Sequence, residues 1–173
     1  MIQQHYEQLN EISLQIEGLL GHRNKSFEAI KATIIGAFYS FYLALTQNYT
    51  DDLNKGISDD YLENIVKNYK DLKDKKWEAG YYFNSALYRL SAAYHRALKV
   101  YTKKLRTNHN IPKLLERAKQ LGLTEDEVLN LEIIRKSVNL LKHEVFGLTK
   151  GKRPTIDQVI KAFKELLDFF EKI

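Results

Sequence analysis

Four polar side chains of chemically useful types lie close together in a stretch otherwise rich in leucine, isoleucine and valine. They are Arg135, Asn139, Lys142 and His143, within the sequence NLEIIRKSVNLLKHEVFG at positions 130–147. A histidine titrates near neutral pH and suits proton transfer, whereas arginine and lysine suit stabilisation of developing negative charge. The set is compatible with the phosphate-handling edge of a nuclease, and also with an ordinary solvated helix face.

The helical period places all four residues on one face. Successive residues of a helix are offset by about 100°, so the four fall within an arc of about 100°. The neighbouring leucines and isoleucines fall on the opposite side and predict a core-facing stripe. Because most amphipathic helices carry a polar face, the geometry alone favours the solvated-face interpretation.

The distribution of charge favours a polyanionic partner. The net charge of the chain is +5. Positions 135–153 hold six Lys or Arg and one acid, so this segment alone carries a net charge equal to that of the whole chain. A second run, 96–113, has six basic residues and no acid. Concentrated positive charge is the footprint of a nucleic-acid site. Besides the four residues above, the predicted nucleic-acid contacts are Lys136, Lys150, Lys152, Arg153, Arg96, Lys99, Lys103, Lys104 and Arg106. Tyr101 could stack on a base, whereas Tyr94 is expected in the core.

The whole chain predicts one all-α domain that positions these residues. It has 173 residues, 44% of them hydrophobic and 28% charged, with only two prolines and eight glycines. Few breaks of this kind favour long helices over many short strands. The expected helices cover about 2–20, 27–48, a short polar one ending near 75, 77–106, 111–121, 125–146, and a last one beginning after Thr155.

Local signals mark several of the expected helix ends. Asn110 should cap the helix that has Pro112 in its first turn, and Gly122 should end it. Two capping boxes, Thr124 with Glu127 and Thr155 with Gln158, should open the last two helices. Gly21 is expected to end the first helix, and Ser26 and Ser58 to cap the second and third.

Other site types find little support in the sequence. There are no cysteines, which excludes disulfides and zinc–thiolate sites. His5, His95 and His109 lack His or acidic partners at metal-ligand spacing, so we expect neither a metal nor a cofactor. The uncharged stretch 32–50 approaches the length of a membrane span. Its tyrosines, threonines and amides favour a buried core helix, and a cytoplasmic location with no membrane partner is expected.

The segment IPKLLERAKQLGLTEDEVLNLEIIRKSVNLLKHE, at 111–144, resembles the third-and-fourth-helix region of HEPN domains. These all-α bundles carry an R-x4-6-H motif, commonly with a polar residue after the arginine. The resemblance covers about 77–173, with 1–75 as an N-terminal helical elaboration of the same single domain. With His143 as the motif histidine and Asn139 as the polar residue, Val138 occupies the arginine position. Arg135 lies one turn earlier on the same face.

The resemblance implies a metal-independent endoribonuclease of a toxin–antitoxin or phage-defence system. His143 would be the acid and base, Arg135 and Lys142 would stabilise charge, and Asn139 would position the RNA. The family commonly pairs two such helices, which implies a homodimer. A catalytically silent module is the alternative, and it would bind nucleic acid, nucleotide or a protein partner such as an antitoxin. A third interpretation is a helical adaptor whose basic faces are merely solvated.

Overall fold

The computed structural model describes residues 5–20, 28–46, 75–143 and 154–173, and this part of the chain contains helices and no strand. The all-α class is therefore confirmed for these residues. The helices are α1 (Tyr6–Leu20), α2 (Glu28–Thr46), α5 (Lys75–Tyr101), α6 (Ile111–Gln120), α7 (Leu129–His143) and α8 (Ile156–Glu171), with a short 3-10 turn, η4 (Asp126–Val128), before α7. The polar helix expected before residue 75, and the signals at Gly21, Ser26 and Ser58, lie outside the described residues.

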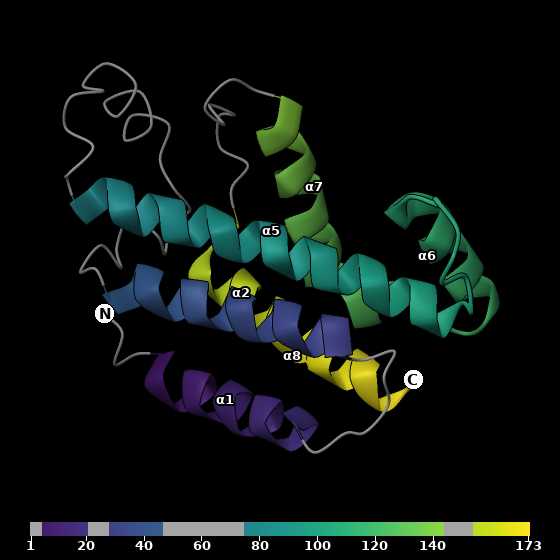
Figure 1. Ribbon diagram of the computed structural model, residues 1–173, viewed down its shortest axis with the longest axis horizontal. Helices are drawn as coiled ribbons and strands as arrows, with labels where there is room; N and C mark the ends of the chain where they lie inside the picture. The colour runs from purple at the N-terminus through teal and green to yellow at the C-terminus, as the bar shows by residue number, and fades with distance from the viewer. Residues whose placement is uncertain (1–4, 21–27, 47–74, 144–153) are drawn as a thin grey trace.

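Helices α2 and α5 run side by side through the middle of the molecule (Figure 1). Helix α1 packs against α2 and α8, while α7 packs against both α5 and α8. Helix α6 lies beside the C-terminal end of α5, at the right of Figure 1. Helix α5 is thus the element that α2, α6, α7 and α8 share.

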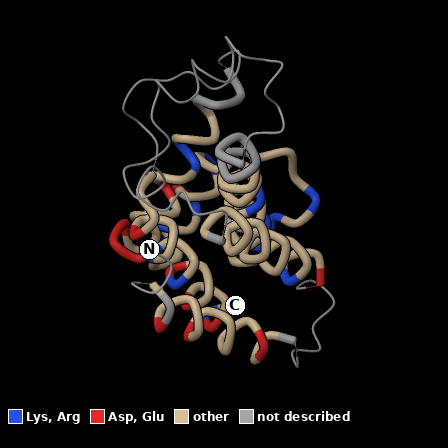
Figure 2. The backbone as a smooth tube through the Cα atoms, turned by 90° about the vertical axis from the view of Figure 1, so that its left-hand side faces the viewer, with Lys and Arg blue, Asp and Glu red and all other residues tan. Residues whose placement is uncertain are grey.

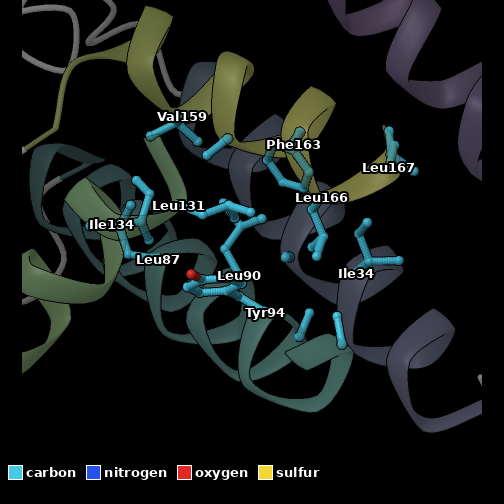
Figure 3. Close-up of a cluster of buried hydrophobic side chains, with 14 of the residues drawn as sticks. Ile34, Leu87, Leu90, Tyr94, Leu131, Ile134, Val159, Phe163, Leu166 and Leu167 are labelled. Atoms are coloured by element: carbon cyan, nitrogen blue, oxygen red, sulfur yellow. The ribbon is translucent and has the colours of Figure 1, made fainter. Parts of the chain in front are cut away.

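One continuous hydrophobic cluster holds these helices together. Figure 3 shows side chains of α2, α5, α7 and α8 converging, among them Ile34, Leu90, Leu131 and Phe163. The Phe163 ring is centred 5.8 Å from the ring of Phe41, a favourable aromatic distance. Burial of each such side chain contributes about 1.5–3 kcal/mol, so the core fixes α7, the helix of interest, on α5 and α8.

Helix α2 is the one helix in the described ranges that is long and apolar enough to cross a membrane by length and composition. In this structure one face of α2 packs on α5, and 44% of the 28–45 window is buried. Two arginines of α5 reinforce that packing. Arg89 donates to the Gly36 carbonyl at 3.0 Å, and Arg96 donates to the Ala29 carbonyl at 3.1 Å.

The end of α5 differs from its predicted end. The sequence places it near Arg106, whereas the helix stops at Tyr101 because Lys103 adopts a left-handed backbone with φ 56°. The Lys104 N–H bonds the Lys99 carbonyl and the Lys103 N–H bonds that of Val100, which is the hydrogen-bond pattern of a Schellman motif. A glycine usually occupies this position, so a lysine gives no sequence signal for it.

Most of the predicted caps around α6 and α8 are present. Asn110 accepts a hydrogen bond from the Lys113 N–H, and Gly122, with φ 106°, ends α6. Thr155 and Gln158 form both bonds of a capping box at α8. The capping box predicted before α7 is formed in one direction only, since Glu127 accepts from the Thr124 N–H while η4 has no side-chain cap.

Candidate nucleic-acid interface

The first turn of α7 is capped by a carboxylate from another helix. Glu165 of α8 accepts hydrogen bonds from the backbone N–H groups of Asn130 at 3.0 Å and Leu131 at 2.9 Å, and from the Asn130 side-chain amide at 2.8 Å. These backbone N–H groups have no partner within the helix, and negative charge at a helix N-terminus is favourable. Glu165 therefore sets where α7 begins and ties it to α8. Sequence reasoning missed it.

Arg135 forms a two-point ion pair with Glu132, one turn earlier on α7. The guanidinium donates through Nε at 2.7 Å and Nη2 at 2.9 Å to the two carboxylate oxygens. Only 13% of the Arg135 side chain and 18% of the Glu132 side chain are exposed. The bond to Glu132 raises the pKa of Arg135, so the arginine is charged but largely neutralised by its neighbour. The spacing of three residues is visible in the sequence.

Tyr94 lies beneath this ion pair. Its ring is fully buried and its hydroxyl finds no partner in hydrogen-bonding geometry among the described residues. In Figure 3 the hydroxyl points toward α7. Burial raises the pKa of the Tyr94 phenol well above its usual range, and the negative charge of Glu132 adds to the rise while Arg135 opposes it. Tyr94 is thus a core residue, as its position in the helical pattern predicts.

The remaining motif positions on α7 separate into buried and exposed. Val138, at the position an arginine occupies in the HEPN pattern, is 1% exposed and belongs to the core. Asn139 and Lys136 are exposed, and Lys136 makes no ion pair among the described residues. Lys142 and His143 form the last turn of α7, but their side chains lie outside the described part, as do Lys150, Lys152 and Arg153.

A pocket of about 290 Å³ opens between α6, η4 and the first half of α7. Three apolar residues line it, namely Leu115, Val128 and Leu129. Five charged residues also line it: Lys119, Glu125, Glu132, Arg135 and Lys136. Lys119 pairs with Glu125 at 2.5 Å, and the hydrogen bond from Lys119 lowers the pKa of Glu125. Lys119, Glu125 and Glu132 were not among the residues selected from the sequence.

The other predicted basic run forms an exposed surface from the end of α5 to the start of α6. We call it the 99–113 basic surface, and its cations are Lys99, Lys103, Lys104, Arg106 and Lys113. All but Lys99, which is half-buried, are exposed, and no ion pair to a described residue is found for them. Three glutamates lie on α1, at the bottom of Figure 2, and the acid nearest to this surface along the chain is Glu116, one turn after Lys113 on α6. The Schellman turn ends α5 just before the consecutive lysines 103 and 104, both of which are exposed.

Two residues of that run have structural partners instead. Arg96 donates to the Ala29 carbonyl and, at 2.7 Å, to the Thr33 hydroxyl, so its guanidinium is engaged on α2. The Tyr101 ring packs on Phe169 with centroids 5.2 Å apart, and its hydroxyl donates to the Leu121 carbonyl. The structure therefore gives no support to base stacking by Tyr101, which is used to join α5 and α8.

The histidines of the described part do not gather into a metal site. No group of three or more His, Asp or Glu side chains able to hold a metal is found in the described residues. The His95 ring Nε2 lies 2.9 Å from the His109 carbonyl, and His5 lies 3.6 Å from an Asp157 carboxylate oxygen. Both rings thus join neighbouring segments of the chain.

Comparison with known proteins finds no matching family model, no matching curated protein and no matching solved structure.

Proposed function

We propose that this chain is an HEPN-like RNA-binding module that contacts the phosphate backbone through the 99–113 basic surface. One observation carries the proposal. The run 96–113 contains no acid, and four of the five cations of that surface are exposed without an ion-pair partner among the described residues. Unpaired exposed cations gain most when counterions are released from a polyanion.

Recognition at this surface is expected to depend little on sequence. Phosphate contacts position a protein but do not identify bases. Tyr101, the aromatic residue of the run, is occupied by Phe169 and Leu121, so no stacking platform supplements the lysines there. The affinity for RNA should therefore fall steeply with salt concentration and depend only weakly on the base sequence of the RNA.

The geometry of α7 favours the catalytically silent form of the module over the endoribonuclease. Arg135 is neutralised by Glu132, and Val138 points into the core at the position of the motif arginine. Cleavage needs a cation that meets the negative charge developing on the phosphoryl oxygens, and the Arg135 guanidinium expected in that role is held by Glu132. We therefore propose RNA binding without cleavage as the main function. The same proposal includes a cytoplasmic location, a homodimer, and an antitoxin or another protein as a partner. No metal or cofactor is invoked.

The binding test compares the wild-type protein with a triple variant, Lys104→Ala, Arg106→Ala and Lys113→Ala. Fluorescence anisotropy with a labelled single-stranded RNA is recorded from 50 to 200 mM salt. Each lost phosphate contact lowers the slope of log affinity against log salt by about 0.7, so the triple variant should lose about 2. Lys161→Ala, an exposed lysine on α8, is the control. An unchanged slope in the triple variant contradicts the proposal.

Cleavage is tested separately with His143→Ala. The wild-type protein and the variant are incubated with transfer and ribosomal RNA in EDTA and analysed on a denaturing gel. The silent module predicts intact RNA with both proteins. Fragments from the wild-type protein alone would make the chain a metal-independent ribonuclease and would assign His143 to the chemistry.

A further inference from the structure

The pocket between α6, η4 and α7 combines an apolar floor with a rim of both charges. Val128 and Leu115 are buried and form its inner side, while Leu129, 55% exposed, stands at its edge. At about 290 Å³ it is at the small end of the range for ligand pockets, which runs from about 300 to 1,000 Å³. A pocket of this size takes a single ring system or a similar fragment.

The charges of the rim are only partly used within the protein. Arg135 donates hydrogen bonds from Nε and Nη2 to Glu132, and its Nη1 has no acceptor among the described residues. Lys136 is exposed without an ion-pair partner in that part of the chain. Three cations and two carboxylates line the pocket, which leaves one positive charge in excess.

This composition selects among ligand classes. A small, wholly anionic ligand would meet the Glu125 and Glu132 carboxylates, and a wholly apolar one would cover charged groups without pairing them, which is costly. A ligand with a flat ring, amino donors and one phosphate matches the apolar floor, the two carboxylates and the excess positive charge of the pocket. Its ring covers the leucine and valine floor, its amino groups donate to the carboxylates, and its phosphate meets Lys136.

Helix α6 carries residues of both the pocket and the 99–113 basic surface. Lys113 opens α6 and Lys119 lies in its last turn. Their positions differ by six, which is about 9 Å along the axis and about 120° around it. An RNA strand that binds Lys113 therefore has to pass partly around α6 to reach the pocket.

We propose that this pocket accepts the base of one unpaired nucleotide of the bound RNA, with an adjacent phosphate at Lys136. The proposal rests on the RNA-binding function inferred above and specifies its substrate as single-stranded or looped RNA. A base inside a duplex is stacked and paired and cannot enter such a pocket. Single-stranded RNA should therefore bind more tightly than a duplex of equal length.

The test uses free nucleoside 5′-monophosphates as probes, titrated into the wild-type protein and followed by the NMR shifts of leucine and valine methyl groups. Leu129→Trp fills the mouth of the pocket, and Leu121→Trp is its matched control. Leu121 is 48% exposed, so both substitutions occur at exposed leucines, but Leu121 does not line the pocket.

We expect saturable shifts at Leu115 and Val128 with adenosine, guanosine or cytidine monophosphate. Leu129→Trp and Lys136→Ala should each weaken this binding about tenfold, or about 1.4 kcal/mol, and Leu121→Trp should not. Leu129→Trp should also remove the preference for single-stranded RNA while leaving the affinity for duplex RNA unchanged.

Two results would overturn the proposal. One is the absence of saturable shifts with every monophosphate. The other is ribose 5-phosphate binding as tightly as the nucleotides, which would leave an anion site without a base. RNA binding by the 99–113 basic surface is measured independently in the same variants, so a failure of the pocket is distinguishable from a failure of the RNA-binding function.

Discussion

Glu165 and Asn130, 35 residues apart in sequence, are joined by two hydrogen bonds to one carboxylate oxygen, at 3.0 Å from the backbone N–H and 2.8 Å from the side-chain amide. The other oxygen accepts from the Leu131 N–H at 2.9 Å. Helix α7 thus receives its N-terminal cap from α8.

Removal of this cap should destabilise the fold. We expect Glu165→Ala to lower the free energy of unfolding by about 2 kcal/mol, because charged hydrogen bonds and helix caps each contribute about 1–2 kcal/mol. Urea denaturation followed by circular dichroism measures it. Glu171→Ala, at an exposed position of the same helix, should change stability by less than about 0.5 kcal/mol. Equal effects of the two substitutions would show that Glu165 does not act as a cap.

The Glu132–Arg135 pair should behave as a coupled unit. Each single variant, Glu132→Gln or Arg135→Met, leaves the other side chain largely buried without its partner, which costs more than loss of both. A double-mutant cycle in urea should give a coupling energy of about 1 kcal/mol. The exposed pair Lys119–Glu125 serves as the comparison and should give no measurable coupling. Strict additivity of Glu132→Gln and Arg135→Met would contradict the ion pair.

The Tyr94 hydroxyl has no partner in hydrogen-bonding geometry among the described residues, so it should contribute little to stability near neutral pH. We expect Tyr94→Phe to be neutral or stabilising by up to about 1 kcal/mol, since it removes a buried polar group without a partner. Tyr101→Phe, which loses the bond to the Leu121 carbonyl, should instead cost about 0.5–1 kcal/mol. Thermal denaturation of the two variants provides the comparison, and a clear loss in Tyr94→Phe would point to a missing partner.

The same residue predicts a pH dependence with a definite sign. Burial raises the pKa of Tyr94 in the folded state, so the unfolded chain loses this proton first, near pH 10. The contribution of protonated Tyr94 to the free energy of unfolding is therefore fully present below about pH 10, and it is lost as the pH rises further. Tyr94→Phe should remove that part of the alkaline loss. Unfolding midpoints of the wild-type protein and Tyr94→Phe are measured from pH 8 to 11. Identical pH profiles of the two proteins would show that Tyr94 is not responsible.

Arg96 and Lys104 should show opposite phenotypes although both belong to the predicted basic run. Arg96→Leu removes hydrogen bonds to Ala29 and Thr33 of α2 and should lower stability by about 1 kcal/mol, with RNA affinity within about twofold of wild type. Lys104→Leu should leave stability unchanged and weaken RNA binding. Anisotropy and urea denaturation on both proteins are needed. Weaker RNA binding in Arg96→Leu alone would reverse the assignment.

Most features that depend on contacts within one helical turn were predicted from the sequence, whereas features that depend on distant residues were not. Asn110 and the Thr155–Gln158 pair act within one turn, so their spacing alone predicted the starts of α6 and α8. The all-α class was also predictable, because hydrophobic periodicity is local. The end of α5 at Tyr101 was not, since Lys103 adopts a backbone conformation that glycine usually signals.

The candidate site was predictable only in part, for a related reason. The polar face of α7 follows from periodicity, but Glu165 and Arg96 act on helices far away in sequence. No local pattern could show that one caps α7 and that the other is occupied on α2. The Glu132–Arg135 pair was visible as a spacing of three, but its burial depends on the packing of α7 against α5 and α8.

Helix α1 is attached to the rest of the molecule less extensively than the other long helices. It packs against α2 and α8, and among its described side chains Leu9, Ile12 and Ile16 are the buried hydrophobic ones. Helix α5, in contrast, is shared by α2, α6, α7 and α8. In hydrogen exchange, α1 should therefore open as a separate cooperative unit at a lower free energy, while the amides of α5 exchange only when the whole molecule unfolds.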